Sequence, residues 1–197
     1  MLAVATRSDQ LIRAMQSLEG AFLIGVEGVT EVFLVRHADC YRLMTDHLDP
    51  ALSEVGRAQA RLLARRLERS RPAAVYSSPY RRAVETASAL TDDVRIDERL
   101  VEMALEVNDD GSLDLREPAA DVVERVRGVV DDVIARHTGQ RVVAVTHGAA
   151  IMAYLTHVLG IEPGGLRIYP YFTSITVVRA LGDRRIVGSV GDVAHLE

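Results

Sequence analysis

Lysine is absent from the sequence, and all 23 basic residues are arginine. This absence excludes Schiff-base chemistry, a pyridoxal phosphate lysine and the lysine of a phosphate-binding P-loop. Cysteine is nearly absent as well, because Cys40 is the only one. A single cysteine forms neither an intramolecular disulfide framework nor a thiolate-rich zinc site, and it favours a reducing compartment. We therefore expect a cytoplasmic protein.

The sequence also lacks long hydrophobic runs and an excess of positive charge. Apolar stretches such as 142–145 and 149–155 are much shorter than the roughly 20 residues that cross a bilayer as a helix. The 23 basic and 28 acidic residues give a formal net charge of -5, so no global positive field attracts nucleic acid or an anionic membrane. We predict neither of these partners, and any anion site has to be local.

The composition that is present indicates one folded domain with alternating strands and helices. The chain has 197 residues, of which 48% are hydrophobic and 26% charged, as in soluble globular proteins. Short apolar runs predict strands at 31–35, 73–76, 94–96, 141–145, 174–179 and 185–190, the last two as a hairpin. Helical spacing predicts helices over 8–19, from Ser53 to about 68, from Ser78 and Pro79 to about 90, after Pro118 and over 149–159. The inner faces of two of them are predicted to hold Val55, Ala58, Leu62 and Leu63 in the helix after Ser53, and Val122, Val126, Val129, Val130 and Val133 in the helix after Pro118. This order predicts an α/β fold, a three-layer α/β/α sandwich with a mostly parallel central sheet.

The polar segment 103–117 interrupts this alternation and predicts a small, irregular cap. Residues 106–117 imitate an EF-hand loop, but the first ligand position holds Glu106 and Pro118 follows at once. We therefore interpret the segment as a solvated turn and predict no metal site.

Two histidines stand where a parallel sheet places its ligands. The strand at 31–35 is followed by Arg36 and then by His37. The strand at 141–145 is followed by Thr146 and then by His147. In open α/β sheets, ligands bind at the carboxyl ends of the strands. A lone histidine is more often a surface or core residue, but two at equivalent strand ends indicate a site.

Arginines lie at the same edge. Arg82 follows the strand at 73–76, within the predicted start of a helix, and Arg36 precedes His37. The planar guanidinium donates two hydrogen bonds to phosphate oxygens and keeps its charge. With His147 and the amides of the helix that starts after Gly148, these arginines predict a compact site for a phosphoryl dianion.

Five segments in series resemble the histidine phosphatase superfamily, also called phosphoglycerate mutase-like. They are 35–38 (VRHA), 48–60 (LDPALSEVGRAQA), 77–87 (SSPYRRAVETA), 98–102 (ERLVE) and 145–148 (VTHG). The resemblance covers roughly residues 31–160. It implies a phosphatase that hydrolyses phosphomonoesters through a phosphohistidine intermediate, without metal or cofactor.

The resemblance also implies a role for each matching residue. His37 would be the nucleophile, and Arg36, Arg82 and His147 would hold the phosphoryl group. Glu102 matches the residue that donates a proton to the leaving oxygen, although Glu98 and Glu106 lie close by in the sequence. The tryptophan- and glycine-containing segment that usually follows the family's glutamate is missing here.

Two departures from the family pattern concern the substrate. Ala38 replaces the usual glycine after the nucleophile. Leu43 stands where the family commonly has an asparagine that contacts phosphate, and Arg42 or Tyr41 could replace that hydrogen-bond donor. The Arg-His-Ala sequence is similar to that of bacterial protein phosphohistidine phosphatases. A phosphoprotein substrate therefore stays open beside a small phosphorylated molecule.

Three further alternatives concern the reaction and the chain's first part. Only 45 positions separate Glu102 from His147, which leaves little chain for a water-excluding lid and favours a phosphatase over a phosphoglycerate mutase-type phosphotransferase. A binding module that recognises phosphorylated ligands without turnover is an alternative of a different class. Residues 1–30 precede the histidine phosphatase domain, 31–197, as an accessory segment; we favour a plain helix over an added strand or a homodimer contact.

Overall fold

The structure is a computed structural model that describes residues 6–41, 49–162 and 165–197. Its helices are α1 (Arg7–Ala21), α2 (Glu54–Glu68), α3 (Arg81–Ser88), α4 (Ala119–Arg136), α5 (Gly148–Leu159) and the 3-10 turns η2 (Glu98–Leu100) and η3 (Ala194–Leu196). Its strands are β1 (Thr30–Arg36), β2 (Ala74–Ser77), β3 (Val94–Ile96), β4 (Leu105–Val107), β5 (Leu113–Leu115), β6 (Arg141–Thr146), β7 (Ile175–Leu181) and β8 (Arg184–Asp192).

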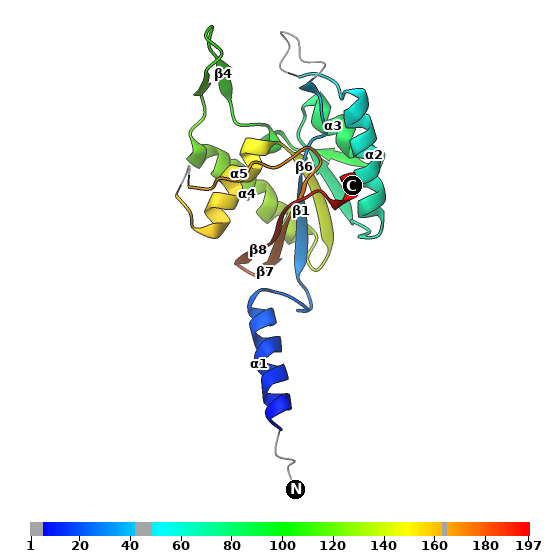
Figure 1. Cartoon of the computed structure of the whole chain (residues 1–197), viewed down its shortest axis with the longest axis vertical. Helices are drawn as coiled ribbons and strands as arrows, with labels where there is room; N and C mark the ends of the chain where they lie inside the picture. The colour runs from blue at the N-terminus through cyan, green and yellow to red at the C-terminus, as the bar shows by residue number, and fades with distance from the viewer. Residues whose placement is uncertain (1–5, 42–48, 163–164) are drawn as a thin grey trace.

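The central sheet has six strands in the order β3-β2-β6-β1-β7-β8 (Figure 1). The first four are parallel to one another, and the hairpin β7–β8 adds two antiparallel strands beside β1. The predicted α/β fold with a mostly parallel sheet is therefore confirmed.

Helices cover both faces of the sheet because β1 and β6 are apolar on both sides. Val32 and Leu34 of β1 pack in one buried cluster with side chains of α4 and α5. Phe33 and Val35, which alternate with them, pack in a second cluster with α2 and α3. A continuous apolar run without alternation is the pattern of a strand that is buried on both faces.

The register of β1 and β6 positions the two histidines. Arg36, the last residue of β1, lies opposite Thr146, the last residue of β6. His37 and His147 are therefore the next residues on two adjacent parallel strands, and the His37 amide donates to the Thr146 carbonyl over 2.9 Å.

Two predicted helix starts were displaced from their observed positions. The predicted helix starts at Ser8, whereas the N-cap of α1 is Thr6. The Thr6 hydroxyl and the Asp9 carboxylate form a reciprocal capping box there. Helix α3 begins at Arg81 and not at Ser78 or Pro79, because Ser78 continues the strand pairing by donating to the Val145 carbonyl.

The predicted inner face of α2 was partly wrong. Val55 and Leu62, which we expected to be buried, are exposed, whereas Leu63 is buried as expected. Gly56 is also buried, and a Cβ there would lie only 2.0 Å from the Asp39 carbonyl oxygen. The first turn of α2 therefore packs directly on the backbone at Asp39 with Gly56, and not with Val55.

The segment 103–117 is a two-stranded hairpin rather than an irregular turn. Strands β4 and β5 pair antiparallel, and the hairpin projects from the domain beside α5 and α4 (Figure 1). Helix α1 projects from the opposite end of the domain, and none of its residues is buried. Within the described residues, no helix combines the length and apolar character that crossing a membrane requires.

Candidate active site

The His37 side chain is held by one hydrogen bond that defines its tautomer. Its Nδ1 lies 2.8 Å from the carbonyl oxygen of Ala38. A carbonyl oxygen only accepts, so Nδ1 carries the proton and Nε2 presents a lone pair. Ala38 is itself fixed, because its amide donates to the hydroxyl of Thr86 on α3 over 2.9 Å. The methyl group of Ala38 is fully buried, so the alanine that replaces the family's glycine fits without reaching solvent.

Arg82 joins His37 to His147. Its Nε lies 3.3 Å from His37 Nε2, and its Nη2 lies 3.3 Å from His147 Nδ1. A guanidinium only donates, so both of these ring nitrogens are unprotonated acceptors. His147 therefore carries its proton on Nε2 and donates it to the Ser78 hydroxyl over 2.8 Å. The two imidazoles are neutral and have opposite tautomers, with both lone pairs directed at one arginine.

Burial keeps both imidazoles neutral. His37 is 4% exposed and His147 fully buried. Burial is the largest cause that lowers the pKa of His37, to about 3; Arg82 and Arg36 lower it further, while the hydrogen bond to Ala38 opposes them. Burial also lowers the pKa of His147 well below its usual range, and the charges of His37, Arg82 and Arg36 act in the same direction.

Arg36 is fixed by aromatic rings and a carbonyl. Its Cζ lies 4.1 Å from the ring centre of Phe172 and 4.8 Å from that of Tyr169. One terminal nitrogen donates to the Pro170 carbonyl over 2.8 Å, and the other donates to the Tyr41 hydroxyl over 2.9 Å. Among the described atoms, its Nε is buried without a hydrogen-bond partner, which leaves a donor for an anion.

Arg82 is positioned by the first turn of α3 and by two further groups. Its Cζ lies 4.7 Å from the ring centre of Tyr80, and its Nη1 lies 3.4 Å from the Asp49 carboxylate. The other oxygen of Asp49 accepts the Arg81 amide at the start of α3, over 2.9 Å. Asp49 is largely exposed, so solvent weakens its attraction for Arg82.

Glu102 lies at the N-terminus of α5. Its carboxylate accepts the amides of Met103 over 2.9 Å, Ala150 over 3.0 Å and Ala149 over 3.4 Å. The first amides of α5, which we expected to face a phosphoryl group, thus bind Glu102 in this structure. A Cβ on Gly148 would approach the Tyr169 ring to 2.8 Å, so the glycine allows Tyr169 to pack beside the start of α5.

A cavity of about 460 Å³ opens above these side chains. Arg36, His37, Arg82 and Glu102 line it, so it brings four of the predicted site residues together. His147 lies fully buried behind His37, with ring centres 5.1 Å apart. Neither Glu98 nor Glu106 lines the cavity, which favours Glu102 among the three acids. Arg42 and Leu43 fall outside the described residues.

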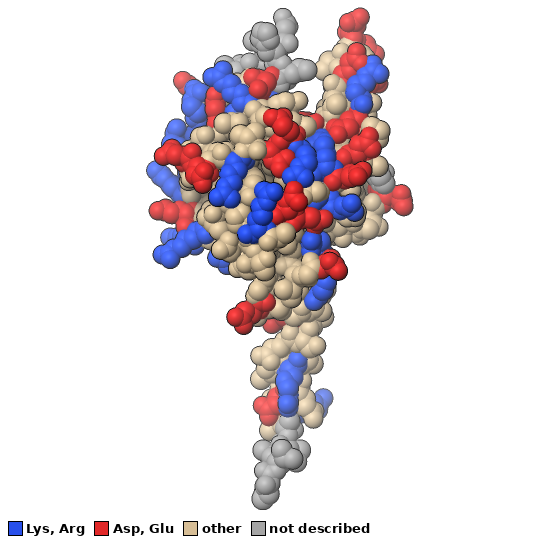
Figure 2. Space-filling model, turned by 180° about the vertical axis from the view of Figure 1, so that it is seen from behind, with Lys and Arg blue, Asp and Glu red and all other residues tan. Residues whose placement is uncertain are grey.

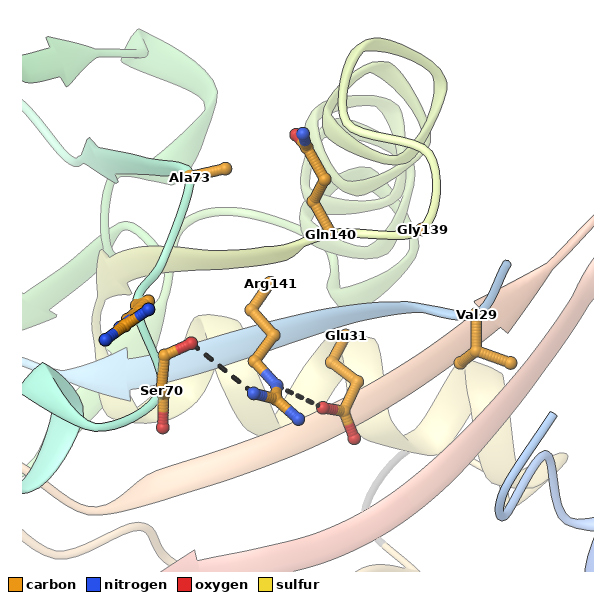
Figure 3. A pocket seen from close by; sticks show the side chains of 8 residues that line it. Val29, Glu31, Ser70, Ala73, Gly139, Gln140 and Arg141 are labelled. Atoms are coloured by element: carbon orange, nitrogen blue, oxygen red, sulfur yellow. Dashed lines mark hydrogen bonds and ion pairs between the residues drawn. The ribbon is translucent and has the colours of Figure 1, made fainter. Parts of the chain in front are cut away.

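A second cavity lies at the opposite, amino edge of β1 and β6 (Figure 3). Its Arg141 forms an ion pair with Glu31 over 2.8 Å and lies 3.5 Å from the Ser70 carbonyl oxygen. This arginine is already neutralised, and no histidine lines the space. The carboxyl edge is therefore the better candidate for phosphate chemistry.

Several contributors to the site had no clear signal in the sequence. Ser78 and Thr86 lie within the segment 77–87, but nothing in the pattern shows that they contact His147 and Ala38. The holders of Arg36 come from 169–172 (YPYF), which no motif marks. The composition of that segment is a signal for contacts with a cation, since it contains three of the chain's nine tyrosine and phenylalanine residues.

Comparison with known proteins agrees with this geometry. The family model described as the histidine phosphatase superfamily (branch 1) matches residues 32–112 and 105–193. Phosphoserine phosphatase 1 of Hydrogenobacter thermophilus is 32% identical over 168 residues, which cover 68% of this chain and 78% of that protein. A metal-independent phosphoserine phosphatase of Arabidopsis thaliana is 27% identical, covering 85% of this chain and 84% of its own length.

A solved structure is similar over most of the chain. Bacillus stearothermophilus YhfR superposes with a TM-score of 0.73 at 29% identity, covering 85% of this chain and all of that one. The chain belongs to branch 1 of the histidine phosphatase superfamily. It is a phosphomonoester hydrolase of the histidine phosphatase type.

The lowered pKa of His37 predicts a pH-dependent contribution to stability. Below about pH 6.5 the unfolded imidazole binds a proton that the folded one does not bind until about pH 3. The free energy of unfolding of the wild type should therefore fall more steeply from pH 6 to pH 4 than that of His37→Asn, by up to about 1.4 kcal/mol per pH unit. Urea unfolding at several pH values measures this difference. Parallel curves for the two proteins would show that folding does not shift this pKa.

Proposed function

We propose that the protein hydrolyses small phosphomonoesters without metal, through a phosphohistidine intermediate formed on His37. The observation that supports this best is the buried, neutral imidazole whose Nδ1–H is held by Ala38 while its Nε2 lone pair faces Arg82 in the cavity. An unprotonated nitrogen is required for nucleophilic attack, and the environment provides one at neutral pH.

The first step transfers the phosphoryl group to His37. Nε2 attacks phosphorus in line with the ester oxygen, the P–N bond forms and the P–O bond to the alcohol breaks. Glu102 donates a proton to the departing oxygen, so the alcohol leaves neutral. The positive charge that develops on the imidazole is stabilised by the Ala38 carbonyl, which already accepts its Nδ1–H.

The second step returns the enzyme to its starting state. Water attacks the phosphorus, Glu102 takes the water proton, and the P–N bond breaks to release inorganic phosphate. The electron pair of the P–N bond returns to His37 Nε2, and Glu102 regains the proton that it gave in the first step.

Positive charge around the phosphoryl oxygens would come from arginine. We assign Arg36 and Arg82 to this role, with Arg36 Nε as a buried donor and the Arg82 N–H groups moving from the imidazoles to the anion. Gly148 and Arg42 stay predicted members of the binding site, and His147, whose Nε2–H is donated to Ser78, would act on the anion through its contact with Arg82. Because permanently charged guanidinium groups supply the charge stabilisation, no metal ion is needed, in line with the metal-independent relative from Arabidopsis.

Hydrolysis is favoured over intramolecular phosphate transfer. A mutase has to protect its phosphohistidine from water, and in the described part of the chain the excursion that lines the cavity after Glu102 is a short two-stranded hairpin. The phosphoserine phosphatases among the relatives also act by hydrolysis, as their names state. A protein phosphohistidine substrate and phospho-ligand binding without turnover remain the alternatives that the experiments below distinguish.

We expect His37→Ala to lose phosphate release by at least about 10³-fold, because no other nitrogen lies in its position. The assay uses wild type and variant with EDTA on ethyl phosphate, phosphoserine, 3-phosphoglycerate and a phosphohistidine peptide. His157→Ala, which removes an exposed histidine near the end of α5, is the matched control and should keep wild-type activity. Metal-dependent release, or an active His37→Ala protein, would contradict the proposal. Isomer conversion without phosphate release would indicate a mutase, and binding without either reaction a binding module.

Glu102→Gln should show the signature of a lost proton donor. For ethyl phosphate, whose alkoxide is a poor leaving group, we expect kcat to fall by about 100-fold or more. For para-nitrophenyl phosphate, whose phenolate leaves without a proton, the first step should slow by less than about tenfold. Glu98→Gln, an exposed glutamate on η2, is the control. Equal losses on both esters would assign Glu102 to phosphate-site structure rather than to proton transfer.

A further inference from the structure

The β4–β5 hairpin has one apolar face and one charged face. Leu105 pairs with Leu115 and Val107 pairs with Leu113, so these four side chains share a face. Glu106 pairs with Asp114 on the other face. The four apolar residues are 37–66% exposed, although each would gain by leaving water.

The hairpin is anchored at its base. Glu117 accepts the Ala104 amide over 3.1 Å and forms an ion pair with Arg125 of α4 over 2.7 Å. Arg125 also donates to the carbonyls of Arg99 and Val101, both over 2.7 Å. These bonds fix the segment that joins Glu102 to the hairpin, so the apolar face has a defined place relative to the catalytic edge.

That place is the wall of the active-site cavity. Leu105, Val107 and Leu113 line the same cavity as His37 and Arg82, together with Met103 and other uncharged side chains. A two-stranded hairpin with one uncovered face is marginally stable in water. The cavity therefore joins the proposed phosphate-binding residues to the apolar face of the hairpin, and that face is continuous with the site of reaction.

The charges on the cavity lining come from residues outside the hairpin. Among its described residues, the charged groups are Arg36, Arg82 and Glu102, which we assign to the phosphoryl group and the leaving oxygen. The described part of the hairpin wall has no cation to pair with a second anionic group of a substrate. A carboxylate next to Leu105, Val107 and Leu113 would lose hydration without gaining a cation from the described part of the hairpin.

We propose that the preferred substrates are phosphomonoesters of apolar alcohols, alkyl or aryl, whose hydrocarbon part lies on the hairpin face formed by Leu105, Val107 and Leu113. This inference rests on the proposed function and names the substrate class of the same site. Phosphoserine and 3-phosphoglycerate, which carry a carboxylate beside the phosphate, are then poor substrates.

A series of n-alkyl phosphates tests the inference. We expect kcat/KM to rise by about two- to fourfold for each added methylene from ethyl to hexyl phosphate, because each methylene leaves water for the hairpin face. Hexyl phosphate should exceed phosphoserine and 3-phosphoglycerate. The measured quantity is phosphate release at substrate concentrations below micelle formation.

Variants on the two faces of the hairpin separate its role from a general defect. The double variant Val107→Thr, Leu113→Asn makes the apolar face polar and should lower the hexyl-to-ethyl ratio of kcat/KM by at least tenfold. Asp114→Asn, on the charged face, should keep the wild-type ratio. Thermal unfolding of both proteins confirms that they are folded.

The outcomes distinguish this inference from the proposed function. A flat alkyl series, or a preference for phosphoserine, in an enzyme that still depends on His37 overturns the apolar substrate class and leaves the phosphatase intact. A double variant that keeps the wild-type ratio also overturns it. A wild-type dimer that dissociates in the double variant would show that a second copy, and not the substrate, covers the face. Failure to hydrolyse any ester would instead reject the proposed function.

Discussion

The donor-only chemistry of one guanidinium determines the state of the whole site. Arg82 lies 3.3 Å from a ring nitrogen of each histidine and has no lone pair to offer either of them. Both facing nitrogens therefore have to be unprotonated. The N–H groups on the far sides of the rings donate hydrogen bonds to the Ala38 carbonyl and the Ser78 hydroxyl. A buried arginine next to imidazolium would bring like charges together, so burial and geometry enforce the same neutral state.

The sheet makes this arrangement possible. Parallel pairing of β1 and β6 ends at the same level, which places His37 and His147 side by side, while β2 leads through Ser78 into the helix that presents Arg82. The apolar clusters on both faces of the sheet fix these three strand ends relative to one another. Basic and acidic side chains are interspersed on the face seen in Figure 2, so a strong anion site depends on this local convergence and not on a general positive surface.

Much of this could be predicted from the sequence, because strand ends are encoded locally. The apolar run before His37 and the run before His147 predict two buried strands, and parallel strands bring their carboxyl ends together. The prediction of a helix with Val122, Val126 and Val133 on its inner face was also correct, because all three side chains are buried.

The remaining features depend on contacts between distant segments. Tyr169 and Phe172 hold Arg36 from a loop more than 130 positions away, and no periodicity records that contact. The hairpin at 103–117 was missed because its strands are short, with turn residues between them. The close approach of Gly56 in α2 to the backbone of Asp39 is a steric constraint that helical spacing alone does not show.

The tautomers of the two histidines test the central claim most directly. Nitrogen-15 NMR of the imidazole side chains in the ligand-free protein distinguishes a protonated from an unprotonated ring nitrogen. With His37→Asn and His147→Asn used for assignment, we expect a neutral His37 with the proton on Nδ1 and a neutral His147 with the proton on Nε2, both unchanged from about pH 5.5 to pH 7.5. An imidazolium at either position in this range, or His37 with its proton on Nε2, would contradict it.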